Sequence, residues 1–490
     1  MTLFSLMAAS CFLFDDPSSS PSSNPLPPND LDNLADGEFY AREWITGNFY
    51  KLKAEMLYEG DKCEIWAEIG KVGTKQAQDI AGEYDNIIRP LIIREFNSEL
   101  YEGRDILEYA NRLVGRTDGK LTILLLDIKD GYKTESDTYT AGYFFSGDFR
   151  PKGKYSAYYS NGRDMIYVDI YPGLKDQKNA KQTYTTFAHE LQHLVNYVTR
   201  YQLRNSNSNI NINMDVWVNE GLSAYAEHLY LGSHPENSCV WLSDKRNTVK
   251  TGNNFFVWGN HDKEPYAIMD DYATVYLFFR WLYLQADTVT GLQSDIFREI
   301  TFSEYHDYRA ITDVAKKIDS TWADWEPLLR TWLAANHNPK AVYGYKNDLY
   351  LQEGHGSAYD WYKGIRIDPM GGSRVSLFPG EGVYSSIINH NSPFTPATFD
   401  RNPNIRYAGL ANSGAINTSS PYSGNVLLTF NAGTGAAIAE PGSLAGVSAS
   451  ITASRTAADN APPVEWAGPF VLDARDMLER NKNKAKGLSR

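Results

Sequence analysis

Residues 183–198 read TYTTFAHELQHLVNYV, and this stretch decides most of what the sequence indicates about the chain. The pattern predicts a helix, with Thr183 able to cap its N-terminus. Residues four apart lie on the same helix face, so the imidazoles of His189 and His193 can reach one metal ion. The apolar residues that give the helical spacing are Phe187, Leu191, Leu194, Val195 and Val198.

Within this stretch, His189 to His193 form an H-E-x-x-H pattern. Zinc prefers nitrogen, sulfur or carboxylate ligands in a tetrahedral array, and a catalytic zinc site keeps one position open for water. Bound zinc lowers the pKa of that water to about 7, and Glu190 can accept its proton as hydroxide attacks a carbonyl. The alternative interpretation is a surface helix that carries two histidines by chance.

A third ligand distinguishes these two interpretations. Position 196 is Asn and position 199 is Thr, which excludes the longer metzincin pattern with its third histidine. A glutamate from a following helix is the other choice, and Glu220 in WVNEGLSAYAE offers it. The 26 residues between His193 and Glu220 include a polar loop at 204–213, where extra length costs little free energy. Otherwise, Glu220 would be an exposed carboxylate near a helix start.

The segments FAHELQHLVNY and WVNEGLSAYAE, and more weakly AGYFFSGDF and MIYVDIYPG, resemble the hyicolysin-type family of gluzincin zinc metallopeptidases. The resemblance covers roughly residues 51–335. It implies an α+β, thermolysin-like core, in which a small twisted sheet lies over the HExxH helix and a helical subdomain closes the cleft. It also implies that His189, His193 and Glu220 bind Zn²⁺ and that Glu190 is the general base.

Helical spacing also indicates residues that could orient a metal ligand or stabilise the oxyanion. Glu227, seven residues after Glu220, shares its helix face and could orient a ligand histidine, or it could be a solvated glutamate. A tetrahedral intermediate needs a donor for its oxyanion, and Tyr272 and Tyr276 are candidates, although core tyrosines are commoner. We interpret His228, which precedes an apolar run, as structural.

Four segments organise the chain. We expect a signal and flexible tether at 1–33, a peptidase subdomain with HExxH at 34–200, a helical subdomain with the third ligand at 201–343, and a β-rich domain at 344–490. Further predicted elements are a hairpin at 51–71, a helix at 77–94 interrupted at Pro90, strands at 120–128, 165–171 and 424–430, and helices at 216–231, 272–285, 291–300 and 322–335.

The N-terminus suggests export. Small residues precede Cys11, as in the lipobox of bacterial lipoproteins, and a Ser/Pro-rich tether follows it. We therefore expect an exported, surface-anchored or secreted protein that meets a membrane only through a lipid on Cys11. Cys63 and Cys239 then remain, either as one disulfide or as two unpaired buried thiols.

Composition narrows the function classes. The 490 residues are 42% hydrophobic and 22% charged, as in ordinary globular proteins. A net charge of −13 argues against a nucleic-acid partner, because such affinity comes from Lys and Arg on phosphates. The sequence predicts a monomeric zinc peptidase that acts on proteins or peptides. It contains no GAMEN-type segment for binding a free N-terminus, which favours an endopeptidase that cleaves inside chains. The alternative is a surface binding protein or adhesin on a metallopeptidase scaffold.

Overall fold

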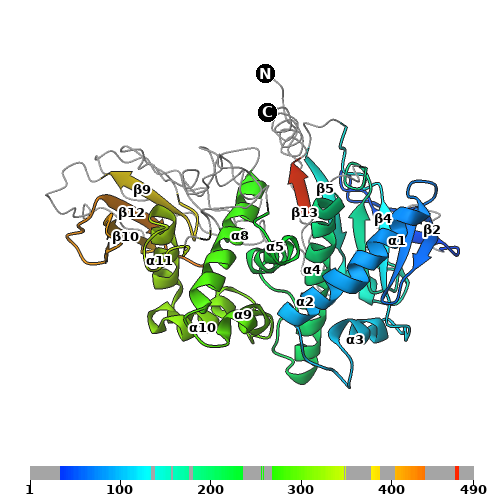
Figure 1. Ribbon diagram of the computed structural model, residues 1–490, viewed down its shortest axis with the longest axis horizontal. Coiled ribbons are helices and arrows are strands. Elements are labelled where there is room, and N and C mark those ends of the chain that lie inside the picture. Colours follow the sequence, from blue (N-terminus) through cyan, green and yellow to red (C-terminus); the bar gives the residue numbers. More distant parts are fainter. Residues whose placement is uncertain are drawn as a thin grey trace, which may run out of the picture. The chain divides into compact units, whose positions relative to one another are not determined.

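The computed structural model describes residues 34–133, 138–155, 158–175, 180–235, 255–256, 258, 267–346, 348, 377–386, 403–435 and 470–473. Its described residues fall into two compact units, one holding 34–232 with 470–473 and the other holding 233–435. Both units mix helices with strands (Figure 1). The four segments expected from the sequence stay a prediction. Cys11 and Cys239 lie outside the described residues.

A seven-stranded mixed sheet organises the first unit, in the order β1-β2-β3-β4-β8-β5-β13. β3, β4 and β8 run parallel, and the remaining neighbours pair antiparallel. A short ribbon of β6 (Gly153–Lys154) and β7 (Tyr159–Ser160) is separate from it. The strands of the sheet are β1 (Glu38–Arg42), β2 (Phe49–Glu59), β3 (Cys63–Glu68), β4 (Leu121–Leu126), β5 (Thr138–Phe144), β8 (Met165–Asp169) and β13 (Phe470–Asp473).

The sheet is covered on both faces, since every residue of β4 is buried. Leu124, Leu126 and Tyr167 belong to one buried cluster. Because successive side chains alternate, Ile123 and Leu125 point to the opposite face. Helices α1 and α4 pack against that side of the sheet (Figure 1). The hairpin predicted at 51–71 and the strands predicted at 120–128 and 165–171 are confirmed.

The described part of the first unit contains five α-helices. The long helix α4 contacts β5, β8, α2, α3 and α5, so it lies at the centre of the unit. A π-helical turn, η1 (Tyr84–Ile88), and a 3-10 turn, η2 (Ser146–Phe149), complete the unit. The α-helices are α1 (Thr74–Glu83), α2 (Arg89–Phe96), α3 (Ile106–Leu113), α4 (Ala180–Ser206) and α5 (Val216–Leu231).

Three local predictions need correction. The helix predicted at 77–94 is interrupted before Pro90, by the π-helical turn η1, and the chain stays helical through Pro90 in the first turn of α2. Thr183 does not cap α4, which begins at Ala180; its hydroxyl donates to the carbonyl of Gly173 at 2.7 Å instead. The polar loop predicted from 204 begins only after Ser206.

The second unit combines helices with an antiparallel sheet of order β11-β10-β12-β9. Helix α11 contacts β12, and the Tyr384 hydroxyl donates to the Leu333 carbonyl at 2.7 Å. The predicted helices and the strand near 424–430 are confirmed. The elements are α8 (Ala267–Ala286), α9 (Leu292–Thr301), α10 (Tyr308–Ile318), η4 (Ser320–Ala323), α11 (Trp325–His337), β9 (Gly382–Ser386), β10 (Ile405–Leu410), β11 (Ile416–Asn417) and β12 (Val426–Asn431).

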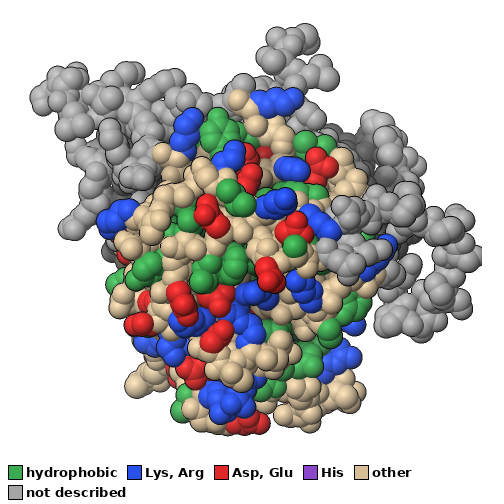
Figure 2. All heavy atoms as spheres, turned by 90° about the vertical axis from the view of Figure 1, so that its right-hand side faces the viewer, with side chains coloured by type: hydrophobic (Ala, Val, Ile, Leu, Met, Phe, Trp, Pro, Cys, Tyr) green, Lys and Arg blue, Asp and Glu red, His purple; other side chains and the backbone are tan. Residues whose placement is uncertain are grey.

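The surface of the first unit carries both signs of charge. Acidic and basic side chains are interspersed on the face in Figure 2, which is the right-hand side of Figure 1. Neither sign dominates there, so this face gives no strong field of one sign to steer a charged ligand. Among the described helices, none is both long and apolar enough to cross a bilayer.

The buried thiol of Cys63 is not in a disulfide. Burial raises the pKa of this thiol, and the neighbouring carboxylate of Asp85 raises it further. A thiol held in its neutral form is a poor nucleophile, so we interpret Cys63 as part of the core.

Asp148 makes the stability of the first unit sensitive to pH. It is 1% exposed and accepts hydrogen bonds from the Asn161 backbone N–H and the Tyr167 hydroxyl. Burial raises its pKa to about 7, although these hydrogen bonds partly oppose the shift. Because the unfolded carboxyl titrates near pH 4, the folded state binds more protons between about pH 4 and 7. Stability from this group is therefore lost as the pH rises through that window.

We expect Asp148→Asn to reduce this pH dependence, because the amide does not titrate. As the pH rises from 4 to 7, the unfolding free energy of the variant should increase relative to that of the wild type. The relative increase should be up to about 1.4 kcal/mol per pH unit. Urea unfolding at several pH values measures it. Equal slopes for the two proteins would show that Asp148 is ionised throughout.

Candidate metal centre

Helices α4 and α5 pack against each other, and their contact buries the residues singled out by the sequence. His189 and His193 occupy successive turns of α4, and Glu220 lies near the start of α5. All three are at most 1% exposed. The five apolar residues that predicted α4 are also buried, so packing fixes the helix around the face that carries the two histidines. The glycine at 232 ends α5 with a φ of 66°, a left-handed conformation that glycine adopts readily.

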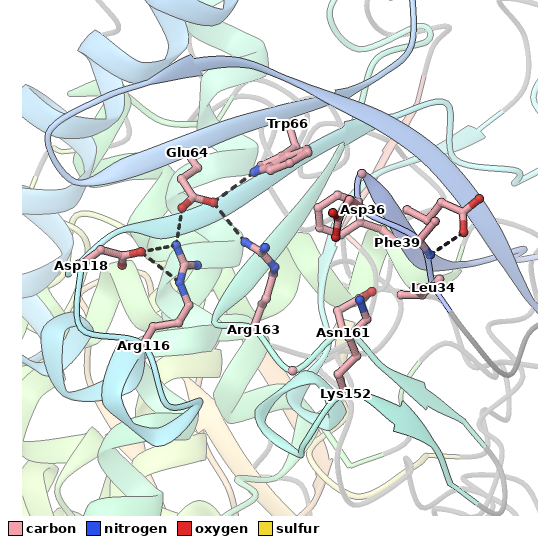
Figure 3. Close-up of a pocket in the computed structure, with 14 residues that line it drawn as sticks. Leu34, Asp36, Phe39, Glu64, Trp66, Arg116, Asp118, Lys152, Asn161 and Arg163 are labelled. Atoms are coloured by element: carbon pink, nitrogen blue, oxygen red, sulfur yellow. Dashed lines mark hydrogen bonds and ion pairs between the residues drawn. The ribbon is translucent and has the colours of Figure 1, made fainter.

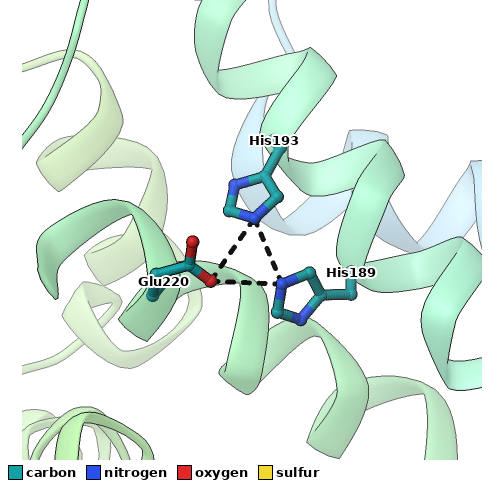
Figure 4. A group of neighbouring side chains, drawn as sticks. All are labelled: His189, His193 and Glu220. Atoms are coloured by element: carbon teal, nitrogen blue, oxygen red, sulfur yellow. Dashed lines mark hydrogen bonds and ion pairs between the residues drawn. The ribbon is translucent and has the colours of Figure 1, made fainter. Parts of the chain in front are cut away.

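The three ligand atoms form a nearly equilateral triangle (Figure 4). The Nε2 atoms of His189 and His193 lie 3.1 Å apart, and Oε2 of Glu220 lies 3.3 Å and 3.5 Å from them, respectively. Two ligands at about 2.0–2.1 Å from a tetrahedral ion lie roughly 3.3 Å apart. The side chains are thus spaced to hold one tetrahedral ion without rearrangement.

The second nitrogen of each imidazole has a partner of its own. Nδ1 of His189 lies 2.9 Å from Oε1 of Glu227, and Nδ1 of His193 lies 3.0 Å from the hydroxyl of Ser223. The Ser223 hydroxyl donates to the side-chain oxygen of Gln192, so it accepts from His193. With a metal bound, each ring would therefore carry its proton on Nδ1 and direct the lone pair of Nε2 at the triangle.

The electrostatics of the cluster favour a positive charge at the triangle. Burial raises the pKa of Glu220, but the charge of His193 and hydrogen bonds with both histidines outweigh it and lower the pKa to about 2. Burial likewise lowers the pKa of His189, but Glu220 and Glu227 outweigh it and raise the pKa to about 10. Without a metal, a proton on His189 would balance this negative charge. A divalent cation would do so more fully.

Glu190 is fully buried next to the triangle but does not belong to it. Neither of its carboxylate oxygens has a well-formed hydrogen bond among the described residues. Burial raises its pKa well above the usual value, partly offset by the charge of His189 and the nearby backbone N–H of Phe144. A buried carboxylate with a raised pKa is suited to accepting and returning a proton.

The tyrosines predicted as oxyanion donors lie in the other compact unit. Tyr272 and Tyr276 are both on α8, and both are buried. The hydroxyl of Tyr276 is hydrogen-bonded to Nδ1 of His234, and the ring of Tyr272 contacts Trp258 edge-on at 5.0 Å. Their proposed role stays a prediction. His228, interpreted as structural, contacts the ring of Tyr225 at 5.1 Å.

The sequence interpretation missed the neutral pair that orients His193. Ser223 is three residues after Glu220, so helical spacing places both on one face of α5. Gln192 occupies one of the variable positions inside HELQH. Spacing alone could have indicated Ser223, but the Gln192 contact depends on how α4 and α5 pack.

A separate cavity of about 400 Å³ lies between β1, β3 and the loops before β4 and β8 (Figure 3). Its central charges are paired with each other. The Glu64 carboxylate accepts from Arg116 at 2.5 Å, from Arg163 at 3.1 Å and from the Trp66 indole at 3.0 Å. Arg116 also pairs with Asp118 at 2.8 Å. We interpret this network as a structural support for the sheet end.

The triangle could hold one metal ion beside a buried carboxylate that could accept a proton. Over 258 residues, the chain is 32% identical to the neutral metalloprotease ShpI of Staphylococcus hyicus, and the match covers 52% of each protein. The chain therefore spans about half the length of the curated relative it matches. No protein-family model matches the chain.

The pairing of Glu227 with His189 predicts a loss of metal affinity in Glu227→Gln. An amide cannot provide the negative charge that orients and polarises the imidazole, so affinity should fall roughly 10–100-fold. Ser223→Ala should cause a smaller loss, because it removes a neutral partner. Zinc titration against a chelating dye measures both variants. An affinity for Glu227→Gln within twofold of wild type would contradict the assignment.

Proposed function

We propose that this protein is a zinc-dependent endopeptidase in which His189, His193 and Glu220 bind the metal and Glu190 is the general base. The observation that carries the proposal is the spacing of the triangle, 3.1–3.5 Å between ligand atoms, beside the fully buried carboxylate of Glu190. The similarity to a neutral metalloprotease supports the same activity. A binding module would need the three ligands at most and would have no need for Glu190.

Zinc fits the donor set better than the common hard cations. Two imidazole nitrogens and one carboxylate oxygen are borderline ligands, whereas calcium and magnesium prefer six or more oxygen ligands. Three protein ligands leave the fourth tetrahedral position for water or substrate. When bound, zinc supplies a Lewis acid that makes a water molecule acidic near neutral pH and polarises a carbonyl.

The protein residues move and hold the protons of the reaction. Glu190 accepts a proton from the attacking water and can return it to the leaving amine, which its raised pKa favours. Glu227 and the Ser223–Gln192 pair keep the protons of both imidazoles on Nδ1. Tyr272 and Tyr276 are our candidates for stabilising the oxyanion.

The substrate class that we propose is protein or peptide, cleaved inside the chain, outside the cell. Export rests on the small residues before Cys11 and the polar tether after it. A lipid on Cys11 would be the contact with the membrane. We further propose a thermolysin-like arrangement of the catalytic core and a monomeric protein.

Glu190→Gln tests the mechanism. The amide cannot accept the proton of water, so kcat/KM for a protein such as unfolded casein should fall by roughly 10²–10⁴-fold. Zinc stoichiometry should stay at that of the wild type, because Glu190 is not a ligand. His189→Ala is the matched control, and it should lose both zinc and activity. Wild-type cleavage by zinc-loaded Glu190→Gln would refute Glu190 as the base.

A further inference from the structure

Strand β5 lies directly against the proposed catalytic base. A methyl group placed on Gly142 would be 2.6 Å from Cγ2 of Thr186 and 3.3 Å from Cγ of Glu190, both on α4. The strand and the HExxH helix are thus in contact at the residue that would act on substrate. Glycine at 142 permits this approach. The outer edge of β5, the side that faces away from β8, therefore belongs to a strand in contact with the proposed base.

That outer edge is paired with a segment from much later in the chain. Phe470, Val471, Leu472 and Asp473 form β13, which runs antiparallel to β5. β13 is the last strand of the sheet, so β5 would be the edge strand without it. Figure 1 shows β13, in red, beside β5 and α4, and β13 also contacts α4.

The register brings this added strand to the level of the base. Phe470 pairs with Gly142, the residue that contacts Glu190, and a register shift follows between Phe470 and Val471. An extended peptide commonly binds a protein by adding a strand to an exposed sheet edge, because its main chain then completes the hydrogen-bond ladder. A polypeptide substrate and β13 would need the same row of β5 hydrogen-bonding groups.

We propose that residues 470–473 are an intramolecular competitor that occupies the peptide-docking edge of β5 and must leave before a polypeptide substrate binds there. This inference rests on the proposed endopeptidase function. The occupant is an extended segment of the same chain, so the site accepts unfolded or extended polypeptide. When a tethered segment occupies the edge, the apparent substrate affinity equals the intrinsic affinity multiplied by the fraction of molecules whose edge is free. A segment in place about 90% of the time raises KM roughly tenfold.

The test compares two double variants of the full-length, zinc-loaded protein. Val471→Pro/Leu472→Pro removes two consecutive backbone N–H groups, and in a strand one of these faces the partner strand. Val471→Ala/Leu472→Ala is the matched control, because it keeps both N–H groups. The measurements are KM and kcat on a fluorescence-quenched peptide, and hydrogen exchange of the β5 amides at 138–144.

The proline variant should have a several-fold lower KM than the alanine variant, with little change in kcat and with faster exchange in β5. A synthetic peptide of residues 466–477, WAGPFVLDARDM, should inhibit the proline variant competitively and restore protection of the β5 amides. Unchanged exchange together with unchanged KM would overturn the docking of this segment. Faster exchange with an unchanged KM would show a structural cover for an aggregation-prone edge and would overturn the competition.

Failure of the underlying function has a different signature. If the wild type and both variants bind zinc but cleave no peptide, the endopeptidase proposal fails and the competitor role fails with it. The exchange data still report whether the segment covers β5, because that measurement does not depend on catalysis.

Discussion

The structure depends on one costly arrangement: three atoms that could hold a metal ion, from His189, His193 and Glu220, meet in a site closed to solvent. Two lone pairs and a carboxylate oxygen within 3.1–3.5 Å of each other repel unless a proton or a metal cation lies between them. Burial removes the water that would otherwise screen this repulsion. The rest of the first unit holds these groups in place, and a bound cation would turn the unfavourable cluster into a stabilising one.

The fold holds these three groups in place by packing other elements against α4 on nearly every side. The sheet packs on it through β5 and β8, and α5 packs on it with the third ligand. The same contacts supply the groups that orient the ligands, since Glu227 and Ser223 come from α5 and Gln192 from α4. β5 brings its backbone to Glu190, so one strand serves both the support of the base and, in our proposal, the docking of polypeptide.

The local sequence pattern was sufficient to predict an element where the spacing of its functional residues matches the repeat of a helix, or where an apolar run marks a buried strand. The spacing of His189 and His193 predicted the helix and the shared face, and the strands at 120–128 and 165–171 followed from apolar runs. Pro90 and Thr183 were misread, because tertiary contacts decide where a helix begins and continues. The pairing of residues 470–473 with β5 joins positions more than 300 residues apart, which no local pattern indicates.

X-ray absorption at the zinc edge of the loaded, full-length protein tests the central claim most directly. The account predicts one zinc per chain with two imidazole nitrogens and one or two oxygens at about 2.0–2.1 Å. Loss of one imidazole from the spectrum in His193→Ala would confirm that α4 supplies the rings. A spectrum without imidazole scattering, or one unchanged in His193→Ala, would contradict the account.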